Sequence, residues 1–229
     1  MEAIILAGGM GTRLREVVTD VPKPMAPVNG KPFLHFILQW LKIYPVNKII
    51  LSVGYKSEKI VEFFGDSFKN TPIEYMIEEG PLGTGGAVKY ALQKTSGDNI
   101  LILNGDTYFP IDLNKFYSFH TSNNNLFSVA LKRMKNFSRY GSVECHENTI
   151  LKFNEKKFSQ DGLINGGIYL AGRKFFESKK LPEVFSLEKD ILEKEAGASI
   201  LKCMEFADLF IDIGIPEDYH RAESILKIS

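Results

Sequence analysis

The chain has 229 residues, of which 44% are hydrophobic, and its basic and acidic side chains balance at 28 each. This composition favours one large α/β domain with a sizeable core over a disordered chain, and the balanced charge argues against binding to nucleic acid or to an anionic membrane. The N-terminus lacks the basic segment of a signal peptide, and no apolar run approaches membrane-spanning length. Cys145 and Cys203 have the spacing of neither a zinc site nor a disulfide framework. We therefore predict a cytoplasmic protein with packed free thiols.

The first informative stretch is an apolar strand, Ile4–Leu6, that opens directly into a glycine-rich loop. Gly8, Gly9 and Gly11 have no Cβ atom, so this loop can approach a flat or charged ligand closely and turn its backbone N–H groups toward an anion. The dinucleotide fingerprint is excluded because its third glycine would fall at Leu14, and the chain has no Walker A triplet. The glycines alone leave two interpretations open, an anion-binding loop and an ordinary strand-to-helix turn.

Two basic residues follow the first glycines. Arg13 offers a planar guanidinium suited to phosphate oxygens. Lys23 offers a compact charge between Pro22 and Pro24, which fix the backbone on either side of it. These residue types together favour a triphosphate-binding site over an ordinary turn.

Strand and helix patterns alternate through the rest of the first half. Apolar residues at helical spacing predict helices over Phe33–Tyr44 and Ser57–Phe64. Short apolar runs predict strands over Lys48–Val53, Ile73–Ile77 and Ile100–Leu103. This alternation favours a mainly parallel sheet with helices on its faces.

A second glycine-rich loop, residues 78–87, follows a predicted strand and precedes a helix predicted over Ala87–Lys94. Open α/β sheets bind ligands at such positions, although a flexible connector is the alternative interpretation. Glu78 and Glu79 supply carboxylates at the start of this loop.

Two aspartates end apolar runs of the sequence. Asp106 comes after Ile100–Leu103, and Asp212 ends an apolar run before a glycine. Asp106 follows a buried central strand, and a carboxylate in that position suits Mg²⁺, which takes one or two carboxylates together with substrate phosphates. A capping role in the following turn is the alternative for Asp106.

From Asp112 onward the pattern changes to clustered short strands, which predict a smaller antiparallel extension on the parallel core. The predicted strands cover Leu126–Leu131, Ser142–Glu144, Ile150–Phe153, Leu163–Leu170 and Ile200–Glu205. A helix capped by Ser186 is predicted before the last of these strands, and a terminal helix begins at Pro216.

The pattern Gly-Gly-x-Gly-x-Arg-Leu, followed by Pro22-Lys23-Pro24, resembles the signature of the sugar-1-phosphate nucleotidylyltransferases, also called sugar-nucleotide pyrophosphorylases. The resemblance covers almost the whole chain and implies a single nucleotidyltransferase domain, residues 1–229. Its expected fold is α/β, with a Rossmann-like mixed, mainly parallel sheet flanked by helices and a smaller antiparallel sugar-binding extension. Residues 1–111 would form the nucleotide-binding half and residues 112–229 the sugar-phosphate-binding half.

The same resemblance implies the roles of individual residues. Nucleotide binding is expected from Leu6, Ala7, Gly8, Gly9, Gly11, Thr12, Glu78, Glu79, Pro81, Gly83 and Thr84. Sugar-phosphate binding is expected from Tyr140, Gly141, Glu155 and Asn165. The expected catalytic residues are Arg13, Lys23 and Lys156, and the expected ligands of Mg²⁺ are Asp106 and Asp212. Lys157 stands where proline is usual in the family, so the path of the chain after Lys156 is left open.

The implied reaction transfers a nucleoside monophosphate from GTP to a sugar 1-phosphate and releases pyrophosphate. The Pro-Leu-Gly-Thr-x-Gly form of the second loop resembles the guanylyltransferase branch, in which a carboxylate from Glu78 or Glu79 would accept two hydrogen bonds from guanine. The first expectation for the sugar is D-glycero-α-D-manno-heptose 1-phosphate, activated for surface polysaccharide synthesis. Mannose 1-phosphate, a UTP- or dTTP-dependent reaction and a non-catalytic nucleotide-sugar sensor are the alternatives. Assembly of several copies is left open.

Overall fold

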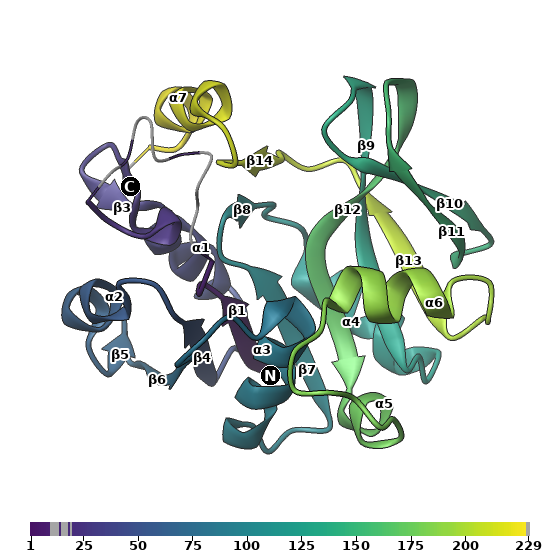
Figure 1. Ribbon diagram of the computed structural model, residues 1–229, viewed down its shortest axis with the longest axis horizontal. Helices are drawn as coiled ribbons and strands as arrows, with labels where there is room; N and C mark the ends of the chain where they lie inside the picture. The colour runs from purple at the N-terminus through teal and green to yellow at the C-terminus, as the bar shows by residue number, and fades with distance from the viewer. Residues whose placement is uncertain (10–13, 15–17, 19, 228–229) are drawn as a thin grey trace.

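A ten-stranded mixed sheet runs through the molecule in the order β10-β11-β13-β9-β12-β7-β1-β4-β6-β5 (Figure 1). The computed structural model describes residues 1–9, 14, 18 and 20–227. The predicted nucleotide-binding residues Gly11 and Thr12 and the predicted catalytic residue Arg13 lie outside the described residues.

Four neighbouring strands form the parallel core that the sequence predicts. They are β1 (Glu2–Leu6), β4 (Lys48–Val53), β6 (Thr71–Ile77) and β7 (Asn99–Asn104). A short strand, β5 (Ser67–Phe68), adds an antiparallel edge to β6. Because the four strands run in one direction, their carboxyl ends meet at one edge of the sheet, where α/β proteins bind ligands.

Helices cover both faces of the parallel strands. One face packs against α1 (Phe33–Leu41), α2 (Ser57–Phe64) and α4 (Leu113–Ser122), and the other against α3 (Gly83–Ala91) and α5 (Arg173–Glu177). Successive residues of β1 alternate between the two cores, with Ala3 and Ile5 in the first and Ile4 in the second. This double burial explains why the central strands are continuous apolar runs in the sequence.

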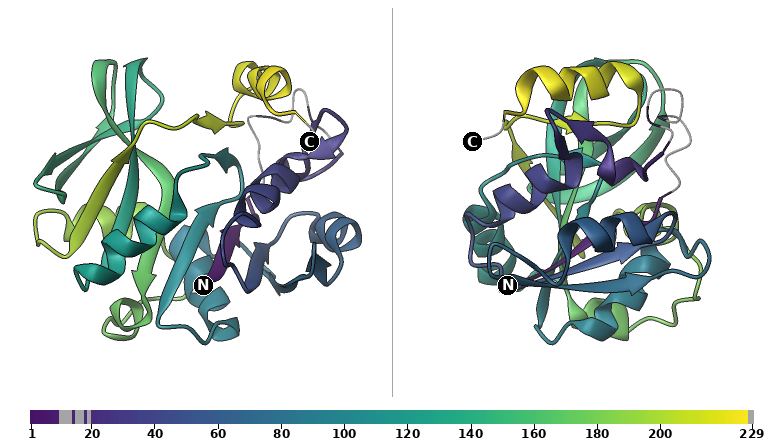
Figure 2. Two further views of the ribbon diagram at one scale, coloured as in Figure 1. Left: turned by 180° about the vertical axis from the view of Figure 1, so that it is seen from behind. Right: turned by 90° about the vertical axis from the view of Figure 1, so that its left-hand side faces the viewer.

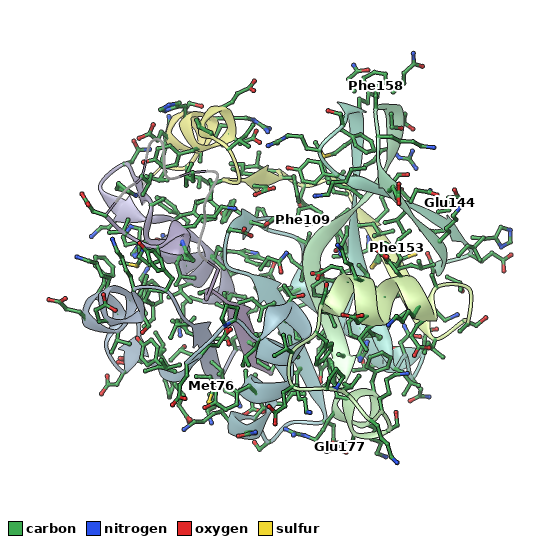
Figure 3. All side chains as sticks on the ribbon, in the orientation of Figure 1. Met76, Phe109, Glu144, Phe153, Phe158 and Glu177 are labelled. Atoms are coloured by element: carbon green, nitrogen blue, oxygen red, sulfur yellow. The ribbon has the colours of Figure 1, made fainter. Side chains whose placement is uncertain are left out.

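The second half of the chain extends the sheet with the predicted antiparallel strands. They are β9 (Phe127–Phe137), β10 (Gly141–His146), β11 (Thr149–Lys156), β12 (Ser159–Gly172) and β13 (Leu201–Phe206), of which β13 runs parallel to β9. The long strand β12 joins the halves, because it pairs antiparallel with β7 along one edge and with β9 along the other. Between β11 and β12, Phe158 projects from the tip of the hairpin, whereas Phe109 lies inside the molecule (Figure 3).

Two short ladders complete the fold. One pairs β2 (Pro27–Val28) with β3 (Lys31–Pro32), and the other pairs β8 (Thr107–Tyr108) with β14 (Ile211–Asp212). The terminal helix α7 (Pro216–Ile225) lies at the same end of the molecule as the outer parts of β9 and β12 (Figures 1 and 2). The β8–β14 ladder brings the predicted metal ligand Asp212 back to the loop after β7, where Asp106 lies.

The start of α3 and the form of the helix after Ser186 differ from the sequence-based expectation, and α1 ends at Leu41 instead of Tyr44. Helix α3 begins at Gly83 instead of Ala87, because the carbonyl group of Phe185 accepts hydrogen bonds from two early N–H groups of this helix, at 3.0 and 3.2 Å. Ser186 caps the next helix as predicted, accepting from the N–H of Lys189. That helix is a π-helix, η4 (Leu187–Leu192), followed by one turn of α-helix, α6 (Glu193–Glu195). Such π-helices are rare and frequently lie at functional sites.

A buried histidine ties α4 to the sheet. The side chain of His120 is 1% exposed, with Nδ1 2.9 Å from Ser128 Oγ of β9 and Nε2 3.1 Å from Asn99 Oδ1 of β7. Burial lowers the pKa of His120 to about 4. The folded chain therefore keeps this ring neutral in mildly acidic solution, where an exposed histidine would bind a proton.

We expect the free energy of unfolding to decrease as the pH falls from about 6.5 to about 4. In this window the unfolded chain binds a proton at His120 that the folded chain does not, and the full effect is about 3 kcal/mol. Denaturant titrations between about pH 7 and pH 5 measure how steeply the free energy of unfolding changes with pH. The variant His120→Asn should largely lose this pH dependence. His35 also has a pKa lowered by burial and adds a smaller contribution of the same sign. Equal slopes in the variant and the native chain would contradict the assignment to His120.

Candidate active site

A cavity of about 680 Å³ lies at the carboxyl ends of the parallel strands. Its lining comes from the segments that follow β1, β4, β6 and β7, from the start of α3, and from the short 3₁₀ turn η2 (Lys23–Met25). The predicted residues that line it are Leu6, Ala7, Gly8, Gly9, Lys23, Glu78, Glu79, Pro81, Gly83, Thr84 and Asp106. The fold thus brings both glycine-rich loops, the lysine between the prolines and the first aspartate around one space.

Glycine occupies positions 8 and 9 of the first loop for different structural reasons. A Cβ atom on Gly8 would lie 2.7 Å from Glu78 Oε1, so a side chain there would displace the Glu78 carboxylate where the first loop passes the second. A Cβ atom on Gly9 would meet no atom within 4 Å, so packing within the described residues does not demand glycine there. Gly9 lines the cavity, and its missing side chain leaves room for a ligand.

Another glycine sets the position of Asp106. Gly105 passes so close to β1 that a Cβ atom would lie 2.7 Å from the carbonyl oxygen of Leu6, and its N–H donates to that oxygen at 2.9 Å. The carbonyl of Asp106 accepts from the N–H of Ile213 at 3.1 Å. These backbone contacts hold Asp106 between β1 and the segment that carries Asp212.

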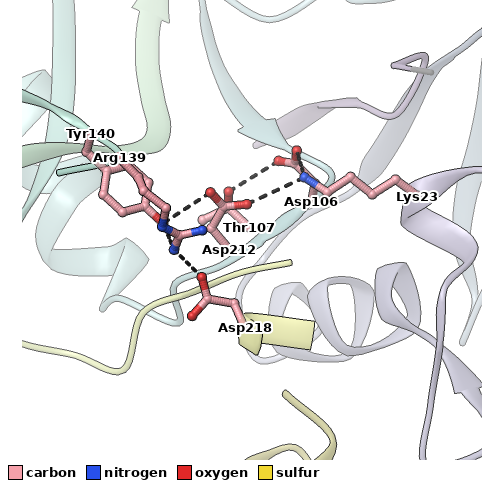
Figure 4. Close-up of polar contacts among 7 residues, drawn as sticks. All are labelled: Lys23, Asp106, Thr107, Arg139, Tyr140, Asp212 and Asp218. Atoms are coloured by element: carbon pink, nitrogen blue, oxygen red, sulfur yellow. Dashed lines mark hydrogen bonds and ion pairs between the residues drawn. The ribbon is translucent and has the colours of Figure 1, made fainter. Parts of the chain in front are cut away.

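Lys23 lies between the two aspartates (Figure 4). Its Nζ is 2.5 Å from Asp106 Oδ2 and 3.5 Å from Asp212 Oδ1, and its side chain is 10% exposed. The backbone at Pro22 is extended and Pro24 occupies the following turn, so the lysine enters the site along a restrained path. One ammonium group therefore joins three segments that are distant in the sequence.

Asp212 is held from its other side by a tyrosine. The hydroxyl of Tyr140 donates to Asp212 Oδ2 at 3.1 Å, and Arg139 Nη2 lies 3.2 Å from that hydroxyl while also forming an ion pair with Asp218 of α7 (Figure 4). Burial and the charge of Asp212 raise the pKa of Tyr140, so the hydroxyl keeps its proton and remains a donor. The sequence singles out Tyr140 for sugar binding, whereas the structure points its hydroxyl at Asp212. The Arg139–Asp218 pair has no sequence signal, since the two residues meet only through the placement of α7.

The two glutamates of the second loop occupy different environments. Glu78 is half-buried: Oε1 accepts from Ser52 Oγ at 3.0 Å, and Oε2 lies 3.4 Å from the N–H of Leu82. Burial raises the pKa of Glu78, which means that the site disfavours its bare charge. Glu79 is exposed. Spacing in the sequence could not separate these neighbours, but the structure does.

Most glycines of the second loop are needed for packing against another part of the chain. A Cβ atom on Gly85 would lie 2.1 Å from the ring of Phe185, and one on Gly86 would lie 2.2 Å from the carbonyl oxygen of Glu183. Gly83 has a φ of +71° and faces the backbone of Phe185 as well. The glycine content of this loop thus reflects close contact with residues 183–185 as much as room for a ligand.

The residues predicted for sugar-phosphate binding lie on the antiparallel extension. Gly141 faces Lys156 across the β10–β11 pair, and Glu155 and Lys156 are exposed. The amide of Asn165 donates to Tyr169 Oη at 2.8 Å and accepts from the N–H of Gly167 at 3.0 Å. These predicted positions do not line the cavity of about 680 Å³. The described residues predicted for nucleotide binding therefore line one cavity, whereas those predicted for sugar-phosphate binding are not part of its lining.

The groups available to a divalent cation are the two aspartates. Among the residues that the structure describes, no three histidine, cysteine, aspartate or glutamate side chains gather as a complete metal cluster. Asp106 and Asp212 nevertheless share one positive charge, that of Lys23. Two converging carboxylates are the donor set that Mg²⁺ takes when substrate phosphates supply further oxygens, so the residues present fit this ion.

The fold and the site define a nucleotide-binding α/β protein whose cavity combines glycine-rich loops, a lysine and paired carboxylates. Comparison with known proteins gives the family: residues 2–227 match the nucleotidyl transferase family, and the chain belongs to it. The membership inferred from the glycine, arginine and Pro-Lys-Pro pattern is thereby confirmed. No helix in the described part of the chain has the length and apolar character needed to cross a membrane.

Full-length relatives share both sequence and structure with the chain. It is 47% identical over 227 residues to a D-glycero-alpha-D-manno-heptose 1-phosphate guanylyltransferase of Aneurinibacillus thermoaerophilus, covering 99% of each chain. A protein of the same name from Campylobacter jejuni is 47% identical over 221 residues, covering 96% of this chain and 97% of the relative. The crystal structure of HddC from Yersinia pseudotuberculosis, complexed with GMP-PN, superimposes with a TM-score of 0.87 at 37% identity and 99% coverage of both chains.

Proposed function

We propose that the chain transfers a guanylyl group from GTP to D-glycero-α-D-manno-heptose 1-phosphate, giving a GDP-sugar and pyrophosphate. The observation that carries this proposal is the Lys23 ammonium set between Asp106 and Asp212 at the edge of a cavity lined by both glycine-rich loops. Full-length relatives named for this reaction, at 47% identity, support the choice of substrates.

The chemistry requires positioning and charge neutralisation more than acid–base catalysis. The attacking group is a phosphate oxygen of the sugar 1-phosphate, which is an anion at neutral pH and needs no general base. A bond forms between this oxygen and the α-phosphorus of GTP, while the bond from that phosphorus to the bridging oxygen of pyrophosphate breaks. Because both substrates are polyanions, the main contribution of the protein is to bring them together and to stabilise the charge that develops.

The basic residues divide this task. We propose that Lys23 stabilises the oxygens of the α-phosphoryl group, that Arg13 binds the leaving phosphates and that Lys156 binds the sugar phosphate. We also propose that Asp106 and Asp212 hold Mg²⁺, which when bound would neutralise charge on the phosphates. Tyr140 supports Asp212 in this arrangement through its hydroxyl group.

The setting of the reaction is part of the proposal. Cys145 and Cys203 are free thiols, which supports action in a reducing cytoplasm. An activated GDP-sugar is consumed by glycosyl transfer, and we propose that this one serves surface polysaccharide synthesis.

A substrate matrix tests the proposed reaction. Pyrophosphate release is measured with GTP, ATP, UTP and dTTP, each combined with the heptose 1-phosphate, mannose 1-phosphate and glucose 1-phosphate. We expect GTP with a manno-configured sugar 1-phosphate to exceed the other triphosphates by at least about tenfold in kcat/KM. Equal or better turnover with UTP or dTTP would overturn the guanine assignment. No pyrophosphate release from any pair would overturn the enzymatic function in favour of a sensor.

Glu78 is the residue that we expect to read the base. Its half-buried carboxylate lies where the two glycine-rich loops meet, whereas Glu79 is exposed. We expect Glu78→Gln to lower the preference for GTP over the other triphosphates by about tenfold, because the amide cannot accept both donors of guanine. Glu79→Gln is the matched control, with the same chemical change one residue away. A larger loss from Glu79→Gln would assign base reading to Glu79.

Lys23 is expected to compete with a divalent cation for the aspartates. We predict that Lys23→Met raises the affinity of the nucleotide-free chain for Mn²⁺ by about tenfold or more. A tenfold change in affinity corresponds to about 1.4 kcal/mol, which is a fraction of the Coulomb energy between unit charges as close as Lys23 and the aspartates. Electron paramagnetic resonance of free Mn²⁺ measures this affinity directly. Lys59→Met, at an exposed position on α2, removes the same charge far from the aspartates and should change little. Unchanged or weaker Mn²⁺ binding in Lys23→Met would contradict the shared site.

A further inference from the structure

Residues 183–188 form a strap over the start of α3, and this strap fixes the second glycine-rich loop. The N–H of Phe185 donates to the carbonyl of Leu82 at 3.0 Å, and the carbonyl of Phe185 accepts from the N–H groups of Gly85 and Gly86. The N-terminal donors of α3 that an anion would otherwise use are therefore partly occupied by the chain itself. The shape of the loop beside the cavity depends on a segment that lies about a hundred residues further along the chain.

Thr84 is the side chain through which the strap holds the loop. Its Oγ1 donates to Glu188 Oε2 at 2.5 Å and accepts from the N–H of Leu187 at 2.9 Å. A hydroxyl group has one hydrogen to donate, so the hydroxyl of Thr84 cannot donate to a nucleotide while it donates to Glu188. Thr84 lines the cavity, but these bonds assign its hydroxyl to Glu188.

Glu188 reaches from this loop to the strand on the sugar side. Its Oε2 also accepts from Ser186 Oγ at 3.0 Å, and its Oε1 lies 3.5 Å from Tyr169 Oη. Tyr169 is fully buried on β12, and its hydroxyl accepts from the amide of Asn165. The carboxylate therefore stands between Thr84, which lines the cavity, and Tyr169, which in turn holds the amide of Asn165, a residue predicted to bind the sugar phosphate.

The setting of this carboxylate is unusual. Glu188 is half-buried. Within the described residues it forms no ion pair with a lysine or arginine. Hydroxyl groups from three different segments surround it instead. A π-helix, a rare conformation that is frequent at functional sites, carries it. Withdrawing a charge from water without an opposite charge is unfavourable, and these hydroxyl groups offset that cost.

We infer that Glu188 is a positioning residue for the proposed guanylyl transfer, fixing the nucleotide-side loop through Thr84 and the sugar-side strand β12 through Tyr169. This inference rests on the proposed function for the identity of the substrates. Glu188 acts through its two neighbours, so its loss should loosen both binding regions and leave the charge-stabilising groups at Lys23 in place. The expected signature is weaker substrate binding at nearly unchanged turnover.

The test begins with Glu188→Gln, which keeps the size of the side chain and removes its charge. We expect KM for GTP to rise about tenfold or more, the effect of losing one charge-assisted hydrogen bond, with a smaller rise in KM for the sugar 1-phosphate and kcat within about threefold of the native value. Glu193→Gln is the matched control, because it makes the same change at an exposed position on the adjoining turn. A native KM for GTP in Glu188→Gln, or an equal rise in Glu193→Gln, would overturn the inference.

A double-mutant cycle with Thr84 separates this role from general destabilisation. Thr84→Val removes the hydroxyl at constant size, and Thr84→Ser retains it. We expect Thr84→Val to raise KM for GTP as Glu188→Gln does, the double variant to be no worse than either single variant, and Thr84→Ser to restore near-native KM. Additive losses, or equal effects of valine and serine, would overturn the inference. Should Glu188→Gln fail to fold, the Thr84→Val and Thr84→Ser pair still decides it.

Direct binding keeps this test independent of the proposed reaction. Calorimetry with GTP alone, on the native chain and on Glu188→Gln, measures the nucleotide-side contact without turnover. If the substrate matrix selects another triphosphate, that triphosphate replaces GTP in the same comparison. Failure of every pair to release pyrophosphate overturns the proposed function, whereas equal triphosphate affinity of the native chain and Glu188→Gln overturns the role of Glu188.

Discussion

One ammonium group, that of Lys23, connects the segments from which the site is built. It lies within 3.5 Å of carboxylates that follow β7 and end β14, so residues 23, 106 and 212 meet at a single point. Two carboxylates that approach the same ammonium group this closely would repel each other if that cation were absent. Because the Lys23 side chain is only 10% exposed, removal of both carboxylates would leave its ammonium group largely buried without an opposite charge. These ion pairs tie η2 to the segments that carry Asp106 and Asp212.

The sheet supplies the framework that makes this meeting possible. Four parallel strands present their carboxyl ends together, and β12 extends the same sheet into the antiparallel region. Because β12 pairs directly with β7, the strand that leads to Asp106 also borders the strand that carries Asn165 and Tyr169. The residues predicted for the nucleotide and those predicted for the sugar phosphate are thus placed by one continuous hydrogen-bonded structure. The strap with Glu188 adds a second connection, between α3 and β12.

The glycines show how one residue type meets different physical demands. Gly9 leaves open space, which suits a loop that must approach a ligand. Gly85 and Gly86 are instead required where two parts of the chain come too close for a side chain, and Gly8 leaves room for the carboxylate of Glu78. The second loop therefore owes its shape to contacts inside the protein, and a ligand would meet a surface that is already fixed, which lowers the entropy lost on binding.

The sequence by itself determined the alternation of strands and helices, the parallel core and the family, because apolar periodicity and the spacing of glycine, arginine and Pro-Lys-Pro are local properties of the chain. It also placed Asp106 and Asp212 correctly at the ends of strands. Only the tertiary structure decided that Glu78 is half-buried while Glu79 is exposed, and that Tyr140 points at Asp212. The Arg139–Asp218 pair and the Thr84–Glu188 bond also come from the tertiary structure, since each joins residues far apart in the chain through the packing of a helix. Local patterns specify which face of an element is apolar, but they carry no information on which distant polar side chain will lie opposite another once those faces are packed.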